Sequence, residues 1–212
     1  MNSGKIENII FDLGGVVINL DMEHTFDWFS QLFGRDVRSN MMDDVRKHHF
    51  FMDFEIGKIS AAEFRDGLRK LTHTEIEDAR LDKAWNAMLG DIPKERTEWI
   101  EELKQDYNVV ILSNTNSIHI EKFNEIFGQT TPYHHPEDLF HKVYYSHEIK
   151  DRKPNRSCFQ HVLDDFGMKA ECTIFYDDNL ENTKAARALG IQSVLVEKNF
   201  LRKEQLPNGR KQ

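Results

Sequence analysis

The sequence is short of cysteine, of basic charge and of long apolar runs, and each shortage argues against a class of protein. It has two cysteines among 212 residues, Cys158 and Cys172, which are too few for a disulfide framework and show no metal-ligand spacing. A net charge of −8 works against binding to nucleic acid or to an anionic membrane surface. No run reaches the roughly 18 apolar residues of a membrane span. We therefore expect a cytoplasmic protein with no nucleic-acid and no membrane partner.

The residues that are present predict an α/β protein. Hydrophobic residues make up 39% and charged residues 30% of the chain, a balance typical of a folded globular protein. Short apolar runs rich in Val, Ile, Phe and Tyr predict buried strands at 8–11, 109–112, 143–145, 173–176 and 193–196. Stretches of helical length lie at 96–105, 117–127, 155–166 and 180–189, with Pro154 expected in a first helical turn. This alternation predicts a parallel sheet with right-handed crossovers.

One connection is far longer than a crossover requires. About 70 residues separate the first predicted strand from the region that leads to the second, where a plain connection is shorter. Within it Ala61, Phe64, Leu68 and Leu71 recur on one helical face, and no strand pattern stands out. We predict a core at 1–21 and 94–212 with an inserted helical cap at 22–93. The alternative is a helical subdomain that only completes the fold.

Polar residues stand where the predicted strands end. They are Asp12 after the first run, Ser113 and Asn114 after the second, Lys153 before the helix at 155–166, and Asp177 and Asp178 after the fourth run. Taken singly, each has a structural explanation as a turn residue, a helix cap or a solvated side chain. Because ligands of parallel sheets bind beyond the carboxyl ends of the strands, the set together predicts one polar cleft.

The composition of this cleft indicates phosphate chemistry with Mg²⁺. Clustered carboxylates repel one another unless a cation is present, and Mg²⁺ binds through one or two carboxylates and a phosphate. Lys153, the Ser113 hydroxyl and the backbone N–H groups near Asn114 and Gly14 would hold the phosphate oxygens. Asp12 is then the candidate nucleophile, which forms an acyl phosphate that water hydrolyses.

Four segments resemble the motifs of a known family. The strings IIFDLGG, VVILSNT, RKP and IFYDDN resemble, in order, motifs one to four of the haloacid dehalogenase superfamily. The string FEIGKIS, with Glu55 and Gly57, resembles a segment of its helical-cap branch. Within that branch the chain is most similar to sugar 1-phosphate phosphatases such as alpha-D-glucose-1-phosphatase. The resemblance implies a Rossmann-like core, a four-helix cap and Mg²⁺-dependent hydrolysis of a small phosphorylated metabolite, with a sugar 1-phosphate as one expected substrate.

The resemblance also implies roles for individual residues. Asp12 would be nucleophile and metal ligand, the Gly14 carbonyl and Asp178 the other metal ligands, and Asp177 their neighbour. Ser113, Asn114 and Lys153 would bind the phosphate, and Lys153 would also serve catalysis.

The sequence departs from the family pattern at Gly14, where most phosphatases of the superfamily have a second Asp that acts as general acid. Such an acid contributes roughly 10²–10⁴-fold, so its absence restricts the substrates or requires a substitute. Asp21, His48, His49 and Glu55 are candidate substitutes, although a surface or packing role suits each of them better. In the segment 128–140, His134 and His135 fit a solvated loop better than a metal site.

Two other functions remain open at this stage. The first is a 2-haloacid dehalogenase, in which Asp12 would attack carbon; that chemistry needs no Mg²⁺, and the Asp177–Asp178 pair argues against it. The second is a catalytically silent protein that keeps the fold and has lost its acid at Gly14. Retention of Asp12, Ser113, Lys153 and Asp178 together favours an enzyme.

Overall fold

Five parallel strands form the centre of the molecule. The computed structural model describes residues 5–38 and 49–207. The strands are β1 (Asn8–Phe11), β2 (Asn108–Ser113), β3 (Lys142–Tyr145), β4 (Thr173–Asp177) and β5 (Gln192–Leu195). Their order is β3-β2-β1-β4-β5, with β1 paired to β2 on one side and to β4 on the other. All five predicted strands are therefore confirmed in position to within about two residues, as is the parallel α/β class. The expected burial is wrong for β5, an edge strand in which no residue is buried.

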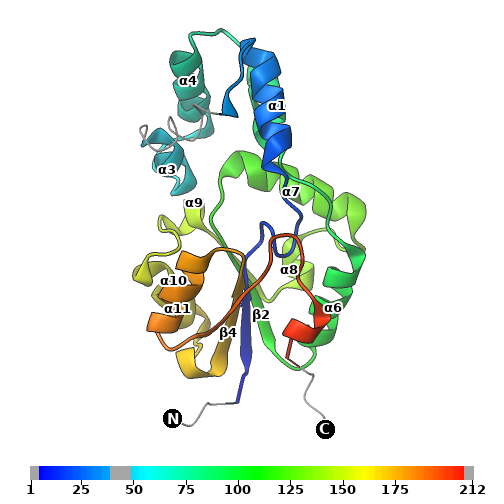
Figure 1. Ribbon diagram of the computed structural model, residues 1–212. Helices are drawn as coiled ribbons and strands as arrows, with labels where there is room; N and C mark the ends of the chain where they lie inside the picture. The colour runs from blue at the N-terminus through cyan, green and yellow to red at the C-terminus, as the bar shows by residue number, and fades with distance from the viewer. Residues whose placement is uncertain (1–4, 39–48, 208–212) are drawn as a thin grey trace.

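Alternating side chains of the strands build a separate core on each face of the sheet. Ile9 and Phe11 face one cluster, which includes residues of α6 (Lys94–Lys104), α7 (Ser117–Thr130) and α8 (Pro136–Leu139). Ile10 faces the other, which includes residues of α10 (Arg156–Phe166) and α11 (Leu180–Ala188). Since successive residues of a strand point to opposite faces, one short apolar run supplies both cores. Figure 1 shows the two helical layers on either side of the sheet.

The remaining short elements refine two of the expectations. Pro154 is not in a first helical turn, because α10 begins at Arg156 with Asn155 as its N-cap. The segment 128–140 is not wholly a loop, since it contains the end of α7 and the short helix α8. The other short pieces are α9 (Ser146–Ile149), η1 (Ala170–Cys172) and η2 (Lys203–Gln205).

The segment 22–93 is here called the helical insertion, and its described helices lie beyond the carboxyl ends of the strands (Figure 1). Its described helices are α1 (Met22–Phe33), α3 (Phe50–Glu55), α4 (Ala61–Thr72) and α5 (Asp78–Asn86). They pack around a third cluster with many aromatic side chains, among them Phe26, Phe29, Phe51, Phe54, Phe64 and Trp85. The predicted face of α4 points into this cluster, with Phe64 and Leu68 buried. Among the described residues, no helix is both long and apolar enough to cross a bilayer.

Candidate active site

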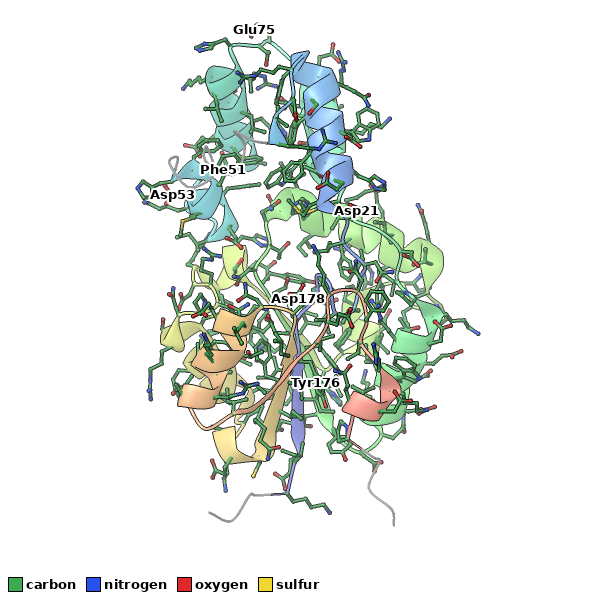
Figure 2. The ribbon with its side chains drawn as sticks, in the orientation of Figure 1. Asp21, Phe51, Asp53, Glu75, Tyr176 and Asp178 are labelled. Atoms are coloured by element: carbon green, nitrogen blue, oxygen red, sulfur yellow. The ribbon has the colours of Figure 1, made fainter. Side chains whose placement is uncertain are left out.

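Asp12 lies at the carboxyl end of β1, the central strand. Its backbone continues the pairing with β4 through a hydrogen bond from Asp12 N to the Tyr176 carbonyl, at 2.8 Å. Its carboxylate oxygen Oδ1 accepts a hydrogen bond from the Leu13 N–H at 2.7 Å and lies 2.8 Å from Lys153 Nζ. Among the described residues no hydrogen bond involves Oδ2, so this oxygen is left for a ligand. Figure 2 shows Asp178 near this point, between the sheet and the helical insertion, with Tyr176 lower in the sheet.

Lys153 is a buried cation held between two carboxylates. Its side chain is 1% exposed, and Nζ lies 2.8 Å from Asp12 Oδ1 and 2.7 Å from Asp177 Oδ2. Burial opposes the charge, but the attraction of Asp12 and Asp177 outweighs it and raises the pKa of Lys153 above its ordinary value. The ammonium group therefore stays charged at neutral pH. Its positive charge lies beside Asp12, where it could offset the charge of a phosphate.

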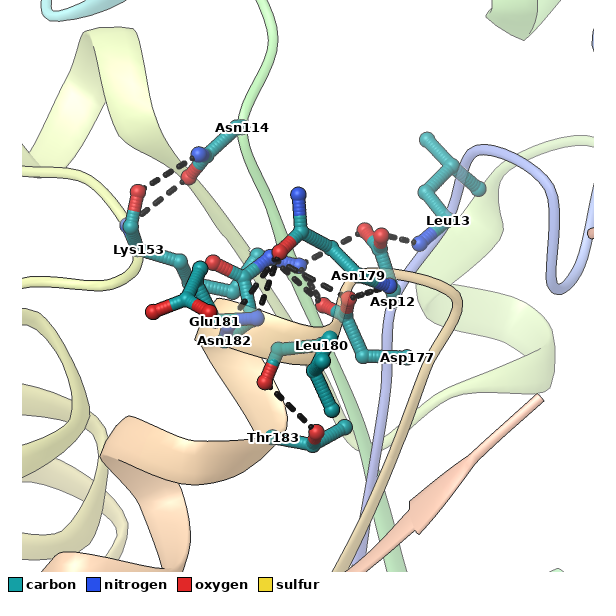
Figure 3. A network of polar contacts seen from close by, with 10 residues as sticks. All are labelled: Asp12, Leu13, Asn114, Lys153, Asp177, Asn179, Leu180, Glu181, Asn182 and Thr183. Carbon is teal, nitrogen blue, oxygen red and sulfur yellow. Dashed lines mark hydrogen bonds and ion pairs between the residues drawn. The ribbon is translucent and has the colours of Figure 1, made fainter.

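The neighbouring residues Asp177 and Asp178 differ in what they contact. Both oxygens of Asp177 are occupied, because Oδ1 accepts from the Asn179 N–H at 2.7 Å and the Asn182 amide also reaches both oxygens (Figure 3). Asp178 is half-buried, and its Oδ2 lies against Gly15, where a Cβ would meet it at 2.4 Å. Gly15 has a φ of 74°, so both its conformation and this close approach suit glycine. Asp177 thus positions Lys153, and Asp178 is the more available ligand.

Burial and mutual repulsion give this group of carboxylates the electrostatics of a cation site. Burial, with further contributions from Asp177 and Asp178, raises the pKa of Asp12 to about 7 despite the opposing effect of Lys153. Burial and Asp177 likewise raise the pKa of Asp178. One oxygen from each of the three residues lies within 4.8 Å of the other two. This set of hard oxygen ligands fits Mg²⁺, whose charge would offset the repulsion.

Ser113 and Asn114 lie at the end of β2, beside Asp12, and line the same cavity. Ser113 is 3% exposed. The Asn114 side chain contacts the backbone of Lys153, donating to its carbonyl at 2.8 Å and accepting from its N–H at 2.9 Å. Its amide therefore fixes the loop that carries Lys153, and the expected contact of Asn114 with a phosphate stays a prediction.

Gly14 occupies the position of the missing acid, and Leu20 fills the space beside it. A Cβ on Gly14 would lie 2.7 Å from Leu20 Cδ1, a contact that the flexible end of a leucine can relieve. The φ of Gly14 is outside the left-handed region, so its backbone can accept another residue. Asn199 holds Leu20 in place, accepting from its N–H at 2.8 Å and donating to its carbonyl at 2.9 Å.

The candidate substitutes for the acid are placed as surface and packing residues. Asp21 caps α1 through the Glu23 N–H, His49 is exposed, and His48 lies outside the described residues. Glu55 is half-buried and lies 3.2 Å from Arg152. Among the described residues none of these lines the cavity beside Asp12.

His134 and His135 lie away from this site, in the turn before α8. Their backbone N–H groups donate to Asp138 at 3.0 and 2.9 Å, which fixes the start of the helix. In the described part of the chain, the metal-ligand grouping at Asp12, Asp177 and Asp178 includes neither histidine.

Comparison with known proteins identifies the family. A family model described as haloacid dehalogenase-like hydrolase matches residues 6–190. The chain belongs to the haloacid dehalogenase-like hydrolases. This family match covers four of the five strands, β1 to β4, and the helical insertion, and it agrees with the four motifs at the strand ends.

Relatives within the haloacid dehalogenase-like family include enzymes of known structure. The chain is 28% identical over 190 residues to D-ribitol-5-phosphate phosphatase of Bacteroides thetaiotaomicron, covering 89% of this chain and 90% of the relative. A haloacid dehalogenase family enzyme of the same organism, solved with magnesium and inorganic phosphate, is 34% identical with a TM-score of 0.86, over 95% of this chain and all of that one. A predicted hydrolase of this family from Porphyromonas gingivalis is 31% identical with a TM-score of 0.80, over 90% of this chain and 91% of that one.

Sequence reasoning did not find Asn182, which contacts Asp177, or His119. His119, in the first turn of α7, lines the cavity that also contacts Asp12, Ser113 and Asp178. The cavity holds about 240 Å³. A signal for His119 was present, because it follows the family motif SNT by one short turn and so lies at the same edge of the sheet.

Proposed function

We propose that the protein is a Mg²⁺-dependent phosphatase that hydrolyses a small phosphorylated metabolite through an aspartyl-phosphate on Asp12. The observation that supports it best is the grouping of Asp12, Asp177 and Asp178, with buried Lys153 between Asp12 and Asp177. Asp12 and Asp178 of this group line a cavity. The relatives named for phosphatase activity, and the related structure that contains magnesium and phosphate, support the same chemistry.

In the proposed reaction a carboxylate oxygen of Asp12 attacks phosphorus, and the alkoxide of the substrate leaves. The bond from phosphorus to the leaving oxygen breaks as the Asp12–phosphorus bond forms, and water then hydrolyses the acyl phosphate to release phosphate. Lys153 holds Asp12 in place and offsets charge on the phosphate oxygens, while the Ser113 hydroxyl donates to one of them. Bound by Asp12, Asp178 and the Gly14 carbonyl, Mg²⁺ would supply the positive charge that lets one anion approach another.

Asp178 favours this reaction over carbon–halogen hydrolysis. Two of the three carboxylates contact Lys153, whereas for Asp178 no hydrogen bond or ion pair to a side chain is found in the part of the chain described. A third, half-buried carboxylate would repel both the Asp12 nucleophile and a departing halide. With a divalent cation and a phosphate present, the same carboxylate becomes a ligand.

The helical insertion is proposed to act as a cap over this site, with the core at 1–21 and 94–212 and the cap at 22–93. Its residues Met88 and Leu89 line the cavity together with Asp12 and Ser113 of the core. A substrate held there would be enclosed by both parts, so that the core supplies the chemistry and the insertion contributes to selectivity.

Gly14 and the related phosphatase point to different leaving groups. The absence of an acid at Gly14 favours esters whose oxygen departs readily as an anion, such as a sugar 1-phosphate or an aryl phosphate. The relative that acts on D-ribitol 5-phosphate points instead to the phosphate of a primary alcohol. A sugar 1-phosphate and D-ribitol 5-phosphate are both small, hydroxylated phosphate esters. We propose a substrate of this class, with a sugar 1-phosphate as the specific candidate.

The test is turnover of a phosphate panel with Mg²⁺. We would measure kcat/KM for glucose 1-phosphate, glucose 6-phosphate, glycerol phosphate, D-ribitol 5-phosphate and an aryl phosphate, each with Mg²⁺ and with excess chelator. Mg²⁺-dependent release of phosphate, lost in chelator, is the expected result. Full activity in chelator, or no release of phosphate from any ester, would contradict the proposal.

Paired variants at Gly14 and Leu20 test whether the missing acid restricts the leaving group. Because Leu20 fills the space beside Gly14, the variant Gly14→Asp should be made together with Leu20→Ala, with Leu20→Ala alone as the matched reference. A restored acid should increase activity on glycerol phosphate relative to glucose 1-phosphate. If the wild type hydrolyses both at the same rate, a leaving-group restriction is wrong.

A further inference from the structure

His119 is a cavity residue to which neither the family motifs nor the reaction above gives a role. It lies on α7 of the core, but the contacts that hold its ring come from α5 of the helical insertion. Its half-buried ring stacks on Trp85, with ring centroids 5.0 Å apart and planes at 7°. Its Nδ1 lies 2.8 Å from Asn86 Oδ1. The orientation of His119 is therefore set from two directions.

The contact with Asn86 also determines which ring nitrogen can bind a ligand. An amide oxygen is an acceptor, so Nδ1 carries the proton and donates to it. Burial lowers the pKa of His119 to about 3, which keeps the ring neutral at physiological pH. In a neutral imidazole with a proton on Nδ1, the nitrogen Nε2 has a free lone pair. Among the described residues no hydrogen bond involves Nε2.

The surroundings of the cavity show what such an acceptor would serve. Part of the wall beside Asp12 is apolar, formed by Ile18, Leu20, Met88, Leu89, Ile120 and Phe123. A neutral acceptor beside these side chains cannot bind a phosphate dianion, which has no proton to donate at neutral pH. A substrate hydroxyl is a donor, and it would satisfy Nε2 in a place where water is partly excluded.

We propose that His119 is a specificity-determining residue whose Nε2 accepts a hydrogen bond from a hydroxyl group on the carbon chain of the substrate. The site would then select polyhydroxylated phosphate esters over esters of the same length without hydroxyl groups. Asn86 is the positioning residue, since it fixes the tautomer. This inference rests on the proposed phosphatase function and narrows its substrate class.

The test compares two five-carbon esters that differ in their hydroxyl groups, D-ribitol 5-phosphate and n-pentyl phosphate. We would measure kcat/KM for both, with Mg²⁺, in the wild type and in His119→Phe, which keeps an aromatic ring against Trp85 but lacks the acceptor. The ratio of the two values should fall about tenfold or more, mainly through KM. His119→Gln, which retains an acceptor, should recover part of the ratio.

The controls separate this role from two others. His161→Phe makes the same change at an exposed position away from the cavity and should leave the ratio at its wild-type value. An equal loss on both esters in His119→Phe, with or without a lower Tm, would overturn the proposal, because a proton donor or a purely structural residue would affect both alike. If no phosphate ester is hydrolysed at all, the phosphatase function fails by itself. Calorimetric binding of the two esters then tests His119, and equal affinities in wild type and variant would contradict its role.

Discussion

The sheet edge of the core and the helical insertion are stabilised in different ways. At the sheet edge, directional contacts fix each functional group: Lys153 lies between Asp12 and Asp177, and Asn182 completes the contacts of Asp177. The insertion is held by aromatic side chains around Phe64, where packing is less directional. A polar site fixed by directional contacts beside a layer with an aromatic core suits a division in which the core carries the reaction and the insertion contributes to selectivity.

One group of polar contacts between the two regions lies around a single turn. Ser146 donates to the Glu55 carbonyl at 2.6 Å, and Lys150 donates to the Gly57 carbonyl at 2.7 Å. Both core residues belong to the segment that leads into Lys153. A short stretch of chain therefore connects these contacts with the insertion to the cation of the site. The experiments below test this division, from the largest expected effect to the smallest.

Removal of the candidate nucleophile, Asp12, should have the largest effect on kcat. We expect Asp12→Asn to lower kcat by about 10⁴-fold or more, because the amide cannot attack phosphorus. The Tm of the metal-free variant should change little at pH 8, because two effects oppose each other. Burial raises the pKa of Asp12 to about 7 from 3.8, so the amide avoids a loss of stability that the wild type has as the pH rises between these values. The amide also leaves Lys153 with one carboxylate, Asp177, which costs stability. Retained turnover would remove Asp12 from its role, and a large fall in Tm would show that the ion pair outweighs the cost of burying the Asp12 charge.

Asp177 and Asp178 should give opposite patterns when each is changed to Asn. Asp177→Asn leaves buried Lys153 with one carboxylate, and breaking a buried pair costs about 3–5 kcal/mol, so the Tm should fall clearly. Asp178→Asn breaks no such pair; it should keep the Tm and instead raise the Mg²⁺ concentration needed for activity. Thermal unfolding and a Mg²⁺ titration distinguish the two variants. Equal losses of Tm would mean that Asp178 also supports the fold.

The strand ends could be predicted because two simple rules coincide there. Apolar runs of four to six residues form buried strands, and parallel strands bring their carboxyl ends to one edge. Asp12, Ser113 and Asp178 follow such runs directly, so their meeting required no knowledge of side-chain packing. The same reasoning covers Lys153 less well, because its position depends on a loop that Asn114 holds through two hydrogen bonds.

Contacts between the core and the insertion could not be predicted in this way. His119 and Asn86 are 33 residues apart in sequence and belong to different regions, so no periodicity relates them. Phe51 and Phe54, in the helix α3 of the insertion, are a second example. Both are buried in the aromatic cluster, at 8% and 2% exposure, so substitution there would change stability first. Which side chains are buried in the insertion depends on how all its helices pack together. The hydrophobic pattern of one helix in the sequence does not predict that packing.

Gly57 should be needed for the insertion to pack closely against the core. Its φ is 60°, and a Cβ there would lie 2.1 Å from the His147 carbonyl oxygen, which is backbone and cannot move aside cheaply. We expect Gly57→Ala to cost about 2–3 kcal/mol, lowering the Tm by about 5–10 °C, and to raise KM for a polyol phosphate more than for an aryl phosphate. Lys150→Met, which removes only the exposed hydrogen bond to the same residue, is the matched control and should have a much smaller effect. Identical results for the two variants would mean that the close backbone contact is unimportant.

The smallest change in Tm is expected for a substitution of Glu55, which forms an ion pair between the insertion and the core. Glu55 Oε2 lies 3.2 Å from Arg152 Nε, yet burial raises the pKa of Glu55 against the opposing effects of Arg152 and Lys153. A raised pKa means that the folded protein holds the proton more tightly than the unfolded chain does, so stability falls as the pH rises through this range. Glu55→Gln should therefore have a Tm about 1–2 °C above the wild type at pH 8, with the difference vanishing below pH 4 or so. A lower Tm at pH 8 would show that the pair with Arg152 is net stabilising and that charge, as well as packing, holds the insertion on the core.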